Sequence, residues 1–278
     1  IELLKSVKAL SKVKSKWIIN FNDTSSSISF DSVIIASGGS PKLKGFDWLK
    51  ILGHKIINPI PSLFTFNMPN EPIISLSGIA LKNVRIKILD TKIEILGPLL
   101  ITHWGMSGPV ILKASSIGAR ELFDKKYFFE LQINWLIESN TEFLFKILEN
   151  YSILHSKKFL SKQNPFNLPS RLWSFLITKF IFFNEKKWGE LGKKNMRKLI
   201  ELLTKDIYKV SGKTTFKEEF VTCGGVSLES INIKTMQSKI IDDLYFAGEV
   251  LDIDGITGGY NFQSAWSTGY IAGKLGIN

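Results

Sequence analysis

Cysteine and histidine are scarce in this sequence of 278 residues, which has one cysteine, Cys223, and three histidines. A single cysteine excludes an internal disulfide and fits a reducing compartment. Because no C-x-x-C pair accompanies Cys223, we expect a small core residue there rather than a redox thiol. His54 and His155 lack metal-ligand spacing, so the sequence predicts no metal site.

Long apolar runs are also missing. The most apolar stretch, residues 172–183, is interrupted by Lys179 and is too short to cross a bilayer. We therefore expect a cytoplasmic protein that has no membrane partner. The sequence leaves the oligomeric state open.

Arginine is rare, although the formal net charge is +11. Among the 36 basic residues, the arginines are Arg85, Arg120, Arg171 and Arg197. Phosphate and base recognition favour the planar fork of arginine, so nucleic acid is the less favoured partner and the lysines are predicted to form a solvated face. A nucleic-acid patch remains an alternative where two lysine pairs lie near Trp188, at residues 186–187 and 193–194.

The last forty residues carry the clearest pattern. A short apolar run at 244–247 predicts a buried strand, which Gly248 and Glu249 follow directly. A glycine-rich turn at 255–259 then leads into a segment of helical periodicity. Glycines let the backbone approach a ligand closely, and a helix start offers unpaired N–H groups to electron-rich oxygens. This order indicates a cofactor site.

At these residues the chain resembles a known family. Residues 245–269 are similar, nearly residue for residue, to the C-terminal signature of the YhiN/BaiN-like NAD(P)/FAD-dependent oxidoreductases. Three further regions agree in the same order: 33–40, 99–109, and 221–227 with 234–239. The resemblance implies an α/β fold: a FAD-binding, Rossmann-like domain of the glutathione-reductase type with an inserted β-barrel-like and helical domain. We place the FAD-binding domain at 1–65 and 220–278, and the insertion at 66–219.

One element of that family pattern has no counterpart here. Such flavoproteins open with a strand followed by G-x-G-x-x-G, which admits the FAD pyrophosphate to a helix N-terminus. No such segment precedes Val33, and the sequence begins with Ile1 rather than methionine. We expect an N-terminally truncated fragment whose FAD-binding domain is incomplete, with a naturally short version as the alternative.

The resemblance also implies which residues hold FAD. Gly248 and Glu249 follow a strand, where the carboxylate can accept hydrogen bonds from ribityl or ribose hydroxyls; the alternative is a surface turn acid. Asp252 and Asp254 are equally well interpreted as turn residues or as polar groups at the isoalloxazine edge. A turn at the end of the strand 33–36 is expected near the dinucleotide, or is an ordinary turn; its residues are Ala36, Ser37, Gly38 and Gly39.

The glycine loop is expected beside the flavin ring. Reduction places negative charge near flavin N1, which a helix N-terminus stabilises electrostatically. The cofactor-binding residues predicted there are Thr257, Gly258, Gly259, Tyr260, Asn261 and Gln263. Trp266 and Tyr270 lie four residues apart on one helical face and are predicted to be core residues.

His103 is the candidate catalytic residue, because imidazole titrates near neutrality and can transfer a proton during reduction of a carbonyl or activated alkene. A packed corner of the fold is the alternative.

The predicted function is transfer of hydride between a nicotinamide or organic donor and an unidentified small molecule, with FAD as cofactor and NAD(P)H as a further candidate. The second hypothesis is a non-catalytic remnant, or a basic nucleic-acid-associated protein, that does not retain FAD.

Periodicity gives a coarse secondary structure. Strands are predicted at 73–78, 81–89, 91–96 and 128–133, with a hairpin turn at Asp90 and Thr91. Helices are predicted at 46–52, 110–119, 140–151, 172–183 and 195–203. The resemblance implies that the segment 221–226 helps to close the inserted β-barrel-like domain.

Overall fold

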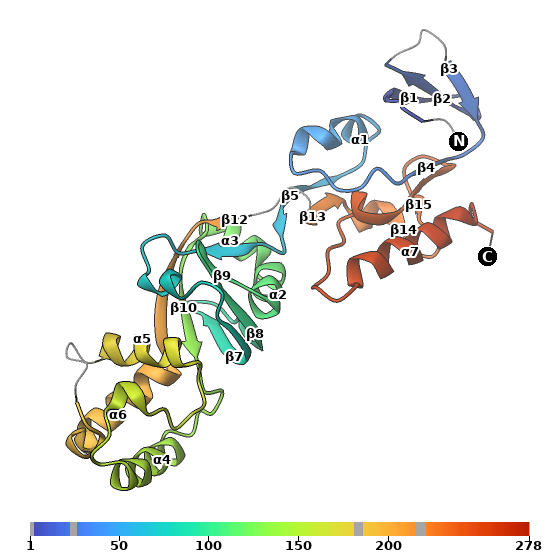
Figure 1. The fold of residues 1–278 in the computed structure, drawn as a ribbon. Helices are drawn as coiled ribbons and strands as arrows, with labels where there is room; N and C mark the ends of the chain where they lie inside the picture. Colours follow the sequence, from blue (N-terminus) through green and yellow to red (C-terminus); the bar gives the residue numbers. More distant parts are fainter. Residues whose placement is uncertain (1–2, 23–26, 181–185, 215–220, 278) are drawn as a thin grey trace. The chain divides into compact units, whose positions relative to one another are not determined.

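The computed structural model describes residues 3–22, 27–180, 186–214 and 221–277. Figure 1 shows a chain that divides into two compact units, one made of residues 1–63 and 216–278 and the other of residues 64–215. The sequence analysis places the divisions after residues 65 and 219. Each unit is described by itself below, as unit 1 and unit 2.

Unit 1 is organised around a parallel pair of strands. Strand β4 (Val33–Ile35) pairs with β16 (Leu244–Phe246), and Val33 lies opposite Leu244. Two short antiparallel strands extend the sheet in the order β14-β15-β16-β4; they are β14 (Ile231–Asn232) and β15 (Gln237–Ser238). Because parallel strands end at the same edge of a sheet, the turns after β4 and β16 meet there. The Ala247 amide donates to the Ile35 carbonyl at 2.9 Å.

The segment before β4 is an antiparallel meander. Its strands are β1 (Val7–Val13), β2 (Lys16–Phe21) and β3 (Ser27–Phe30). After β4 come a 3₁₀ helix η1 (Leu43–Phe46) and the short helix α1 (Asp47–Ile51). The chain leaves α1 at Gly53, whose φ of +89° is in the left-handed region that favours glycine at a helix end. The helix predicted at 46–52 is confirmed by α1.

A two-stranded ladder completes unit 1. Strand β5 (Ile56–Ser62) pairs with β13 (Val221–Val226), and the predicted core position of Cys223 is confirmed by a relative exposure of 7%. The sequence analysis assigned the segment 221–226 to closure of the inserted domain, which is wrong, since its partner strand belongs to unit 1. Strand β13 pairs with a strand that lies far from it in the sequence, and local periodicity does not tell which distant strand is the partner.

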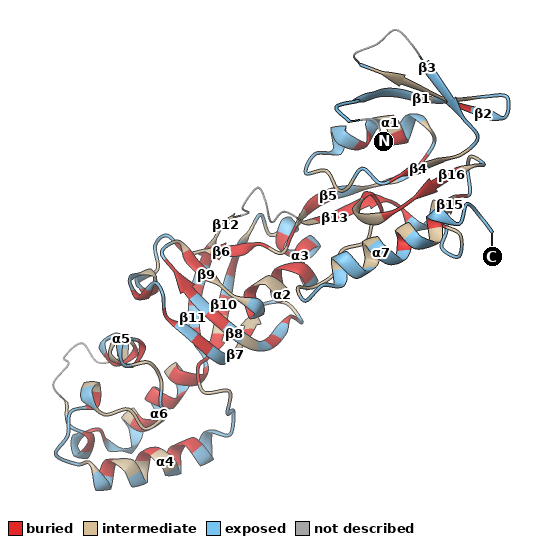
Figure 2. Cartoon of the chain, turned by 45° about the vertical axis from the view of Figure 1, so that its right-hand side comes forward, coloured by how far each residue is buried: buried red, intermediate tan, exposed pale blue. Residues whose placement is uncertain are grey.

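Helix α7 (Tyr260–Gly273) follows the glycine loop and buries Thr268 and Ala272. Trp266 and Tyr270 are 67% and 71% exposed, so the prediction that they are core residues is wrong. Their spacing of four correctly places them on one helical face, but no described element covers that face; exposed residues along α7 are visible in Figure 2. Spacing alone does not tell which face of a helix is buried.

Unit 2 contains a seven-stranded sheet in the order β11-β10-β7-β8-β9-β6-β12. Its strands are β6 (Thr65–Asn67), β7 (Ala80–Ile88), β8 (Glu94–Thr102), β9 (Gly105–Ser107), β10 (Phe128–Asn134), β11 (Asp206–Ser211) and β12 (Lys213–Thr214). Strands β11 and β12 are successive in the chain and are joined at Gly212, whose φ is +123°. The segment that bends at Gly212 therefore forms both edge strands of the sheet, β11 and β12.

Most of the predicted strands of unit 2 are confirmed. The β7–β8 hairpin turns at Asp90, where φ is +58°, and β10 covers the predicted strand at 128–133. The strand predicted at 73–78 is wrong, because a 3₁₀ helix, η2 (Pro72–Leu76), occupies most of that range. Pro72 pre-sets a helical φ at the first position, and Ile73 and Leu76 bury side chains at a spacing of three.

Helices form the rest of unit 2. Helix α2 (Pro109–Ile117) covers most of the helix predicted at 110–119 and ends at Gly118, after which α3 (Ala119–Asp124) begins. The three predicted helices of the second half are confirmed as α4 (Thr141–Leu154), α5 (Ser170–Phe180) and α6 (Gly192–Thr204), although residues 181–183 lie outside the described residues. No helix in the described ranges has the length and apolar character needed to cross a membrane.

The helical part of unit 2, residues 140–205, is called the cap below; its buried aromatic residues belong to the same hydrophobic core as the sheet. The rings of Trp173 and Trp188 stack at a centroid distance of 6.4 Å, and both are almost fully buried. At the cap's base the carboxylate of Asp206 accepts hydrogen bonds from Trp135 Nε1 at 3.0 Å and Lys179 Nζ at 2.6 Å. Tyr208 donates to the same carboxylate; its burial, with the charge of Asp206, raises the pKa of the Tyr208 hydroxyl well above its ordinary value.

Buried His54 makes the stability of unit 1 depend on pH. Its side chain is 3% exposed, and Nε2 hydrogen-bonds Ser238 Oγ at 2.9 Å. Burial lowers the pKa of His54 below its ordinary value of 6.5. The unfolded chain then binds a proton more readily than the folded chain, so the free energy of unfolding falls as pH drops from about 6.5 toward the lower folded pKa.

The substitution His54→Gln is expected to remove this acid-dependent loss, since glutamine does not titrate and can still bond Ser238. Urea unfolding at pH 7.5 and at pH 5 measures the effect. The parent protein should lose more stability between the two pH values than the variant does. Equal losses in both proteins would contradict a buried, neutral His54.

Candidate functional site

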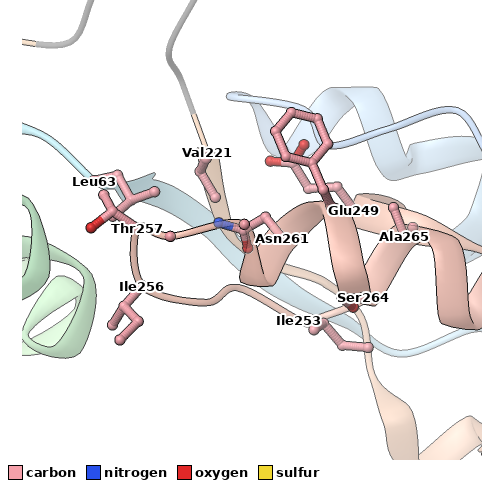
Figure 3. A pocket seen from close by; sticks show the side chains of 13 residues that line it. Leu63, Val221, Glu249, Ile253, Ile256, Thr257, Asn261, Ser264 and Ala265 are labelled. Carbon is pink, nitrogen blue, oxygen red and sulfur yellow. The ribbon is translucent and has the colours of Figure 1, made fainter.

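A cavity of about 410 Å³ lies in unit 1, where the glycine loop meets the start of α7. Figure 3 shows the side chains around it, most of which come from the 3₁₀ helix η6 (Gly248–Val250), the loop 253–259 and the first two turns of α7. The others are Leu63, which follows β5, and Val221, the first residue of β13. The lining includes Leu63, Val221, Gly248, Glu249, Ile253, Ile256, Thr257, Gly258, Gly259, Asn261, Phe262, Ser264 and Ala265. Apart from Glu249, Thr257, Asn261 and Ser264, the lining side chains are apolar or glycine, which suits a flat, largely apolar ligand.

Glu249 is held in place from two sides. Its Oε1 accepts a hydrogen bond of 2.7 Å from the amide of Thr222 in β13. The preceding residue, Gly248, has a φ of +76°, and its amide donates to Thr268 Oγ1 at 2.9 Å. The Thr268 hydroxyl in turn donates to the Ser264 carbonyl within α7 at 2.7 Å. The turn that carries the carboxylate is thus tied to both β13 and α7.

Gly39 brings the turn after β4 against this carboxylate. A Cβ atom added at Gly39 would lie 2.6 Å from Thr222 Oγ1 and 2.8 Å from Glu249 Oε1, so any larger residue forces these groups apart. Thr222 is fully buried, and its hydroxyl has no hydrogen-bond partner in the described part of the chain. A buried hydroxyl without a partner costs free energy unless something else bonds it.

The loop before α7 is closed by a side-chain clamp. Asn261 Oδ1 accepts from the Gly255 amide at 2.7 Å, and Asn261 Nδ2 donates to the Gly255 carbonyl at 3.0 Å. Gly258 and Gly259 follow with φ values of +112° and +89°, conformations that side-chain-bearing residues rarely adopt. Gly259 is the N-cap of α7 and makes no side-chain cap bond, so the first amides of α7 remain available to an external acceptor.

The structure brings together six of the predicted cofactor-binding residues around the cavity, namely Gly248, Glu249, Thr257, Gly258, Gly259 and Asn261. Tyr260 is 59% exposed, and Gln263 donates to Ser267 on the helix surface; neither lines the cavity. Asp254 accepts a bond of 2.8 Å from Ser62. Their roles in cofactor binding stay predictions.

The residues of the turn after β4 lie at two different places in unit 1. Gly39 approaches Glu249, whereas Ala36 and Ser37 line a second cavity of unit 1, about 450 Å³ in volume. That cavity also includes Ile34, which is 41% exposed, and Trp48. A role of Ala36, Ser37 and Gly38 toward a dinucleotide remains a prediction.

The candidate catalytic residue lies in the other unit. His103 is exposed in the turn between β8 and β9 and packs edge-on against Trp104 at a ring-centroid distance of 4.4 Å. The catalytic role of His103 stays a prediction. Across the described ranges, no group of three or more His, Cys, Asp or Glu side chains gathers as a metal ion would need.

Sequence reasoning missed Thr222 and Thr268, which position Glu249 and Gly248. Thr222 is 27 residues from Glu249, so only the folded sheet shows their contact. Thr268 carried a weak signal, because it follows Ser264 by four residues in a predicted helix and a threonine there can bond the carbonyl one turn back.

A parallel strand pair, a carboxylate at its edge and a glycine loop before an uncapped helix fit a Rossmann-like nucleotide-binding fold. The family described as HI0933-like protein Rossmann domain matches residues 1–275. The chain belongs to this HI0933-like family. The match confirms the resemblance to the YhiN/BaiN-like flavoproteins and the Rossmann-like α/β character of the fold.

Three curated relatives of this HI0933-like chain illustrate the family's chemistry. A ribosomal RNA dihydrouridine synthase of Haemophilus influenzae is 31% identical over 265 residues, which is 92% of this chain and 62% of the relative. A 3-dehydro-bile acid delta(4,6)-reductase of Clostridium scindens is 27% identical, over 88% of this chain and 61% of the relative. A ribosomal RNA dihydrouridine synthase of Escherichia coli is 28% identical, over 96% and 66%. The chain spans about three fifths to two thirds of these relatives.

The paired variants Gly39→Ala and Gly38→Ala test the approach of the turn to Glu249. Gly39→Ala forces its Cβ against Glu249 and Thr222, whereas a Cβ at Gly38 meets open space and adds only the strain of a φ of +75°. We expect Gly39→Ala to weaken flavin binding at least tenfold and Gly38→Ala to change it less than threefold, measured by flavin fluorescence titration. Equal losses in both variants would contradict displacement of Glu249 as the cause of weakened binding.

Proposed function

We propose that this chain belongs to a FAD-dependent oxidoreductase, and that the cavity between η6 and α7 receives the flavin end of the cofactor. The observation that carries the proposal is the fixed carboxylate of Glu249 at the same cavity as the uncapped start of α7. One oxygen of Glu249 is used by the Thr222 amide, which leaves the other to accept from ligand hydroxyls. Family membership supports the same assignment.

The residues around the cavity fit the parts of a flavin. Glu249 can accept hydrogen bonds from ribityl hydroxyls, and the buried Thr222 hydroxyl, with no partner among the described residues, can bond the same chain of hydroxyls. The first amides of α7 can donate to the pyrimidine edge of the ring and hold negative charge there when the ring is reduced. The apolar side chains of Ile253 and Ile256 exclude water. When bound, FAD would supply hydride transfer, which no side chain of this chain can supply.

The proposed reaction is reduction of a C=C bond conjugated to a carbonyl, with NADH or NADPH as the donor. Both kinds of relative bear names that describe reduction of such a bond: a delta(4,6)-reductase, and a synthase of dihydrouridine, the 5,6-reduced form of uridine. In this reaction the β-carbon gains a hydride and the α-carbon a proton, while the nicotinamide is oxidised. His103 is the candidate source of that proton, and the curled sheet of unit 2 is the candidate barrel-like insertion.

Flavin titration of the 278-residue chain tests the assignment. The fluorescence of FAD and of riboflavin is expected to be quenched saturably when the protein is added. Riboflavin is expected to compete with FAD, because the residues named above are proposed to contact only the flavin end. ADP should compete poorly. Absence of any spectral change with a folded protein would overturn the proposal and favour a non-catalytic or nucleic-acid-associated chain. Saturable FAD binding without bleaching by NADH or NADPH would remove the nicotinamide donor and leave an oxidase.

A further inference from the structure

The positive charge of the chain is concentrated in the cap of unit 2. Residues 140–205 carry 13 Lys and Arg and five Asp and Glu, which gives +8 of the chain's +11. The other residues, three quarters of the chain, are therefore close to neutral. Compositional drift toward lysine would spread the charge evenly, so this distribution calls for a local explanation.

Two lysine pairs that are distant in sequence come together on the cap. The segments 156–160 and 186–189 run antiparallel, with Phe159 opposite Lys187. Three backbone bonds hold them: Leu160 N to Lys186 O at 2.9 Å, Trp188 N to Lys158 O at 3.0 Å, and Gly189 N to Ser156 O at 3.0 Å. This small ladder gathers Lys157, Lys158, Lys186 and Lys187, which we call the lysine ladder.

The ladder lysines are not used for folding. Within the described ranges they make no ion pair, unlike Lys193 and Arg197 of the same cap, which pair with Glu149 and Glu142 at 3.2 Å and 2.8 Å. Among the described residues, the acidic residue nearest in the chain is Glu190, which accepts the backbone amide of Lys187 at 3.2 Å. Lys157, Lys158 and Lys187 are exposed, and Lys186 is partly exposed.

An aromatic residue, Phe159, belongs to the same small ladder as these lysines. Phe159 is 40% exposed and sits between the ladder lysines, directly opposite Lys187. A partly exposed aromatic side chain opposite a lysine suits a ligand that has both anionic groups and flat faces. Single-stranded nucleic acid has this chemistry, since its phosphates pair with lysines and its bases stack on aromatic rings.

We propose that the lysine ladder and Phe159 form a surface of the cap that binds the phosphate backbone and the bases of single-stranded RNA. It goes beyond the proposed function, because it assigns a binding surface and its ligand to the cap of unit 2. Lysine is a point charge without the planar fork that reads bases, so the ladder gives affinity without sequence preference. The scarcity of arginine therefore argues against base readout and not against RNA.

A charge-matched pair of variants tests the surface. The ladder variant replaces Lys157, Lys158, Lys186 and Lys187 by glutamine; the control replaces four exposed lysines elsewhere in unit 2, namely Lys82, Lys92, Lys126 and Lys209. Binding of a fluorescent single-stranded RNA of about 20 nucleotides to cofactor-free protein is measured by anisotropy from 50 to 200 mM KCl. We expect the Kd of the ladder variant to rise at least tenfold and that of the control less than threefold.

The salt dependence gives a second readout. Each lost phosphate contact on a single strand lowers the slope of log Kd against log salt by about 0.7, so four lost contacts lower it by about 3. Phe159→Leu keeps an apolar side chain but removes the stacking face; it should weaken binding about tenfold and leave the slope unchanged. Unchanged circular dichroism melting confirms that each variant folds.

The outcomes separate this inference from the assignment of the flavin site. Equal RNA binding by the ladder variant and the parent overturns the RNA surface, as does an equal loss in the control. Ladder-dependent binding to phosphatidylserine vesicles but not to RNA would overturn it in favour of a membrane surface. Flavin titration of the same variants should give the parent's Kd. If the parent fails to bind flavin while ladder-dependent RNA binding persists, the proposed function fails and the RNA surface stands.

Discussion

Glu249→Gln is expected to raise the Kd for FAD by about 10- to 100-fold, because hydrogen bonds to a charged acceptor contribute about 1.5–3 kcal/mol. Glutamine keeps an oxygen that can accept from the Thr222 amide, the bond that is 2.7 Å long in the parent. It loses the charge and turns the second oxygen, the one left for ligand hydroxyls, into an N–H donor. Titration of flavin fluorescence measures the change.

The stability of the cofactor-free protein serves as the control for this substitution. Glu249→Gln keeps the contact with Thr222, so its unfolding midpoint should lie close to that of the parent. Glu249→Ala leaves the buried Thr222 amide without a partner, so its midpoint should fall further. A Glu249→Gln protein that binds FAD as tightly as the parent would show that the carboxylate is only a turn residue, the alternative interpretation of the sequence.

Gly225→Ala is expected to destabilise unit 1 by about 2–6 kcal/mol, of which about 1–3 is backbone strain and about 1–3 is overpacking. Gly225 has a φ of +140°, and a Cβ there would lie 2.5 Å from the Val250 carbonyl oxygen and 2.9 Å from the Leu251 carbonyl carbon. These are backbone atoms of the segment that carries Glu249, so they cannot rotate away. Domains are stable by only about 5–15 kcal/mol, and flavin binding should be lost with the fold.

Gly269→Ala is the matched control for the glycine effect. Gly269 lies inside α7, and a Cβ there meets nothing within 4 Å. Alanine in a helix interior is favoured over glycine by about 0.5–1 kcal/mol, so this variant should be slightly more stable than the parent. Urea unfolding followed by circular dichroism compares the three proteins. A Gly225→Ala protein as stable as the parent would contradict the close backbone approach.

The sequence predicted the local half of the site. The order of strand, acid, glycine loop and helix is written in consecutive residues, since apolar runs and glycines punctuate the backbone wherever they occur. Glu249 and the loop from Thr257 to Asn261 were found in this way, and the cavity forms around them. The Asp90 hairpin and the cap helices were predicted for the same reason.

The parts of the site that the sequence did not predict depend on contacts between residues far apart in the chain. The contact of Thr222 with Glu249 requires β13 to pair with β5, and the sequence analysis assigned that segment to the wrong sheet. The exposed Trp266 shows the same limit, because the spacing that puts it on one face with Tyr270 does not reveal what covers that face. The two halves of the lysine ladder, 157–158 and 186–187, are joined only through backbone bonds that no periodicity records.

Amide NMR of the 15N-labelled chain during riboflavin titration tests the central claim most directly, because it reports where the flavin binds. The account predicts that the largest shifts occur at the amides of Gly258, Gly259, Tyr260 and Asn261, at the start of α7, with smaller shifts at Glu249. Riboflavin that binds but shifts amides elsewhere, leaving 257–262 unchanged, would contradict the assignment of this cavity to the flavin.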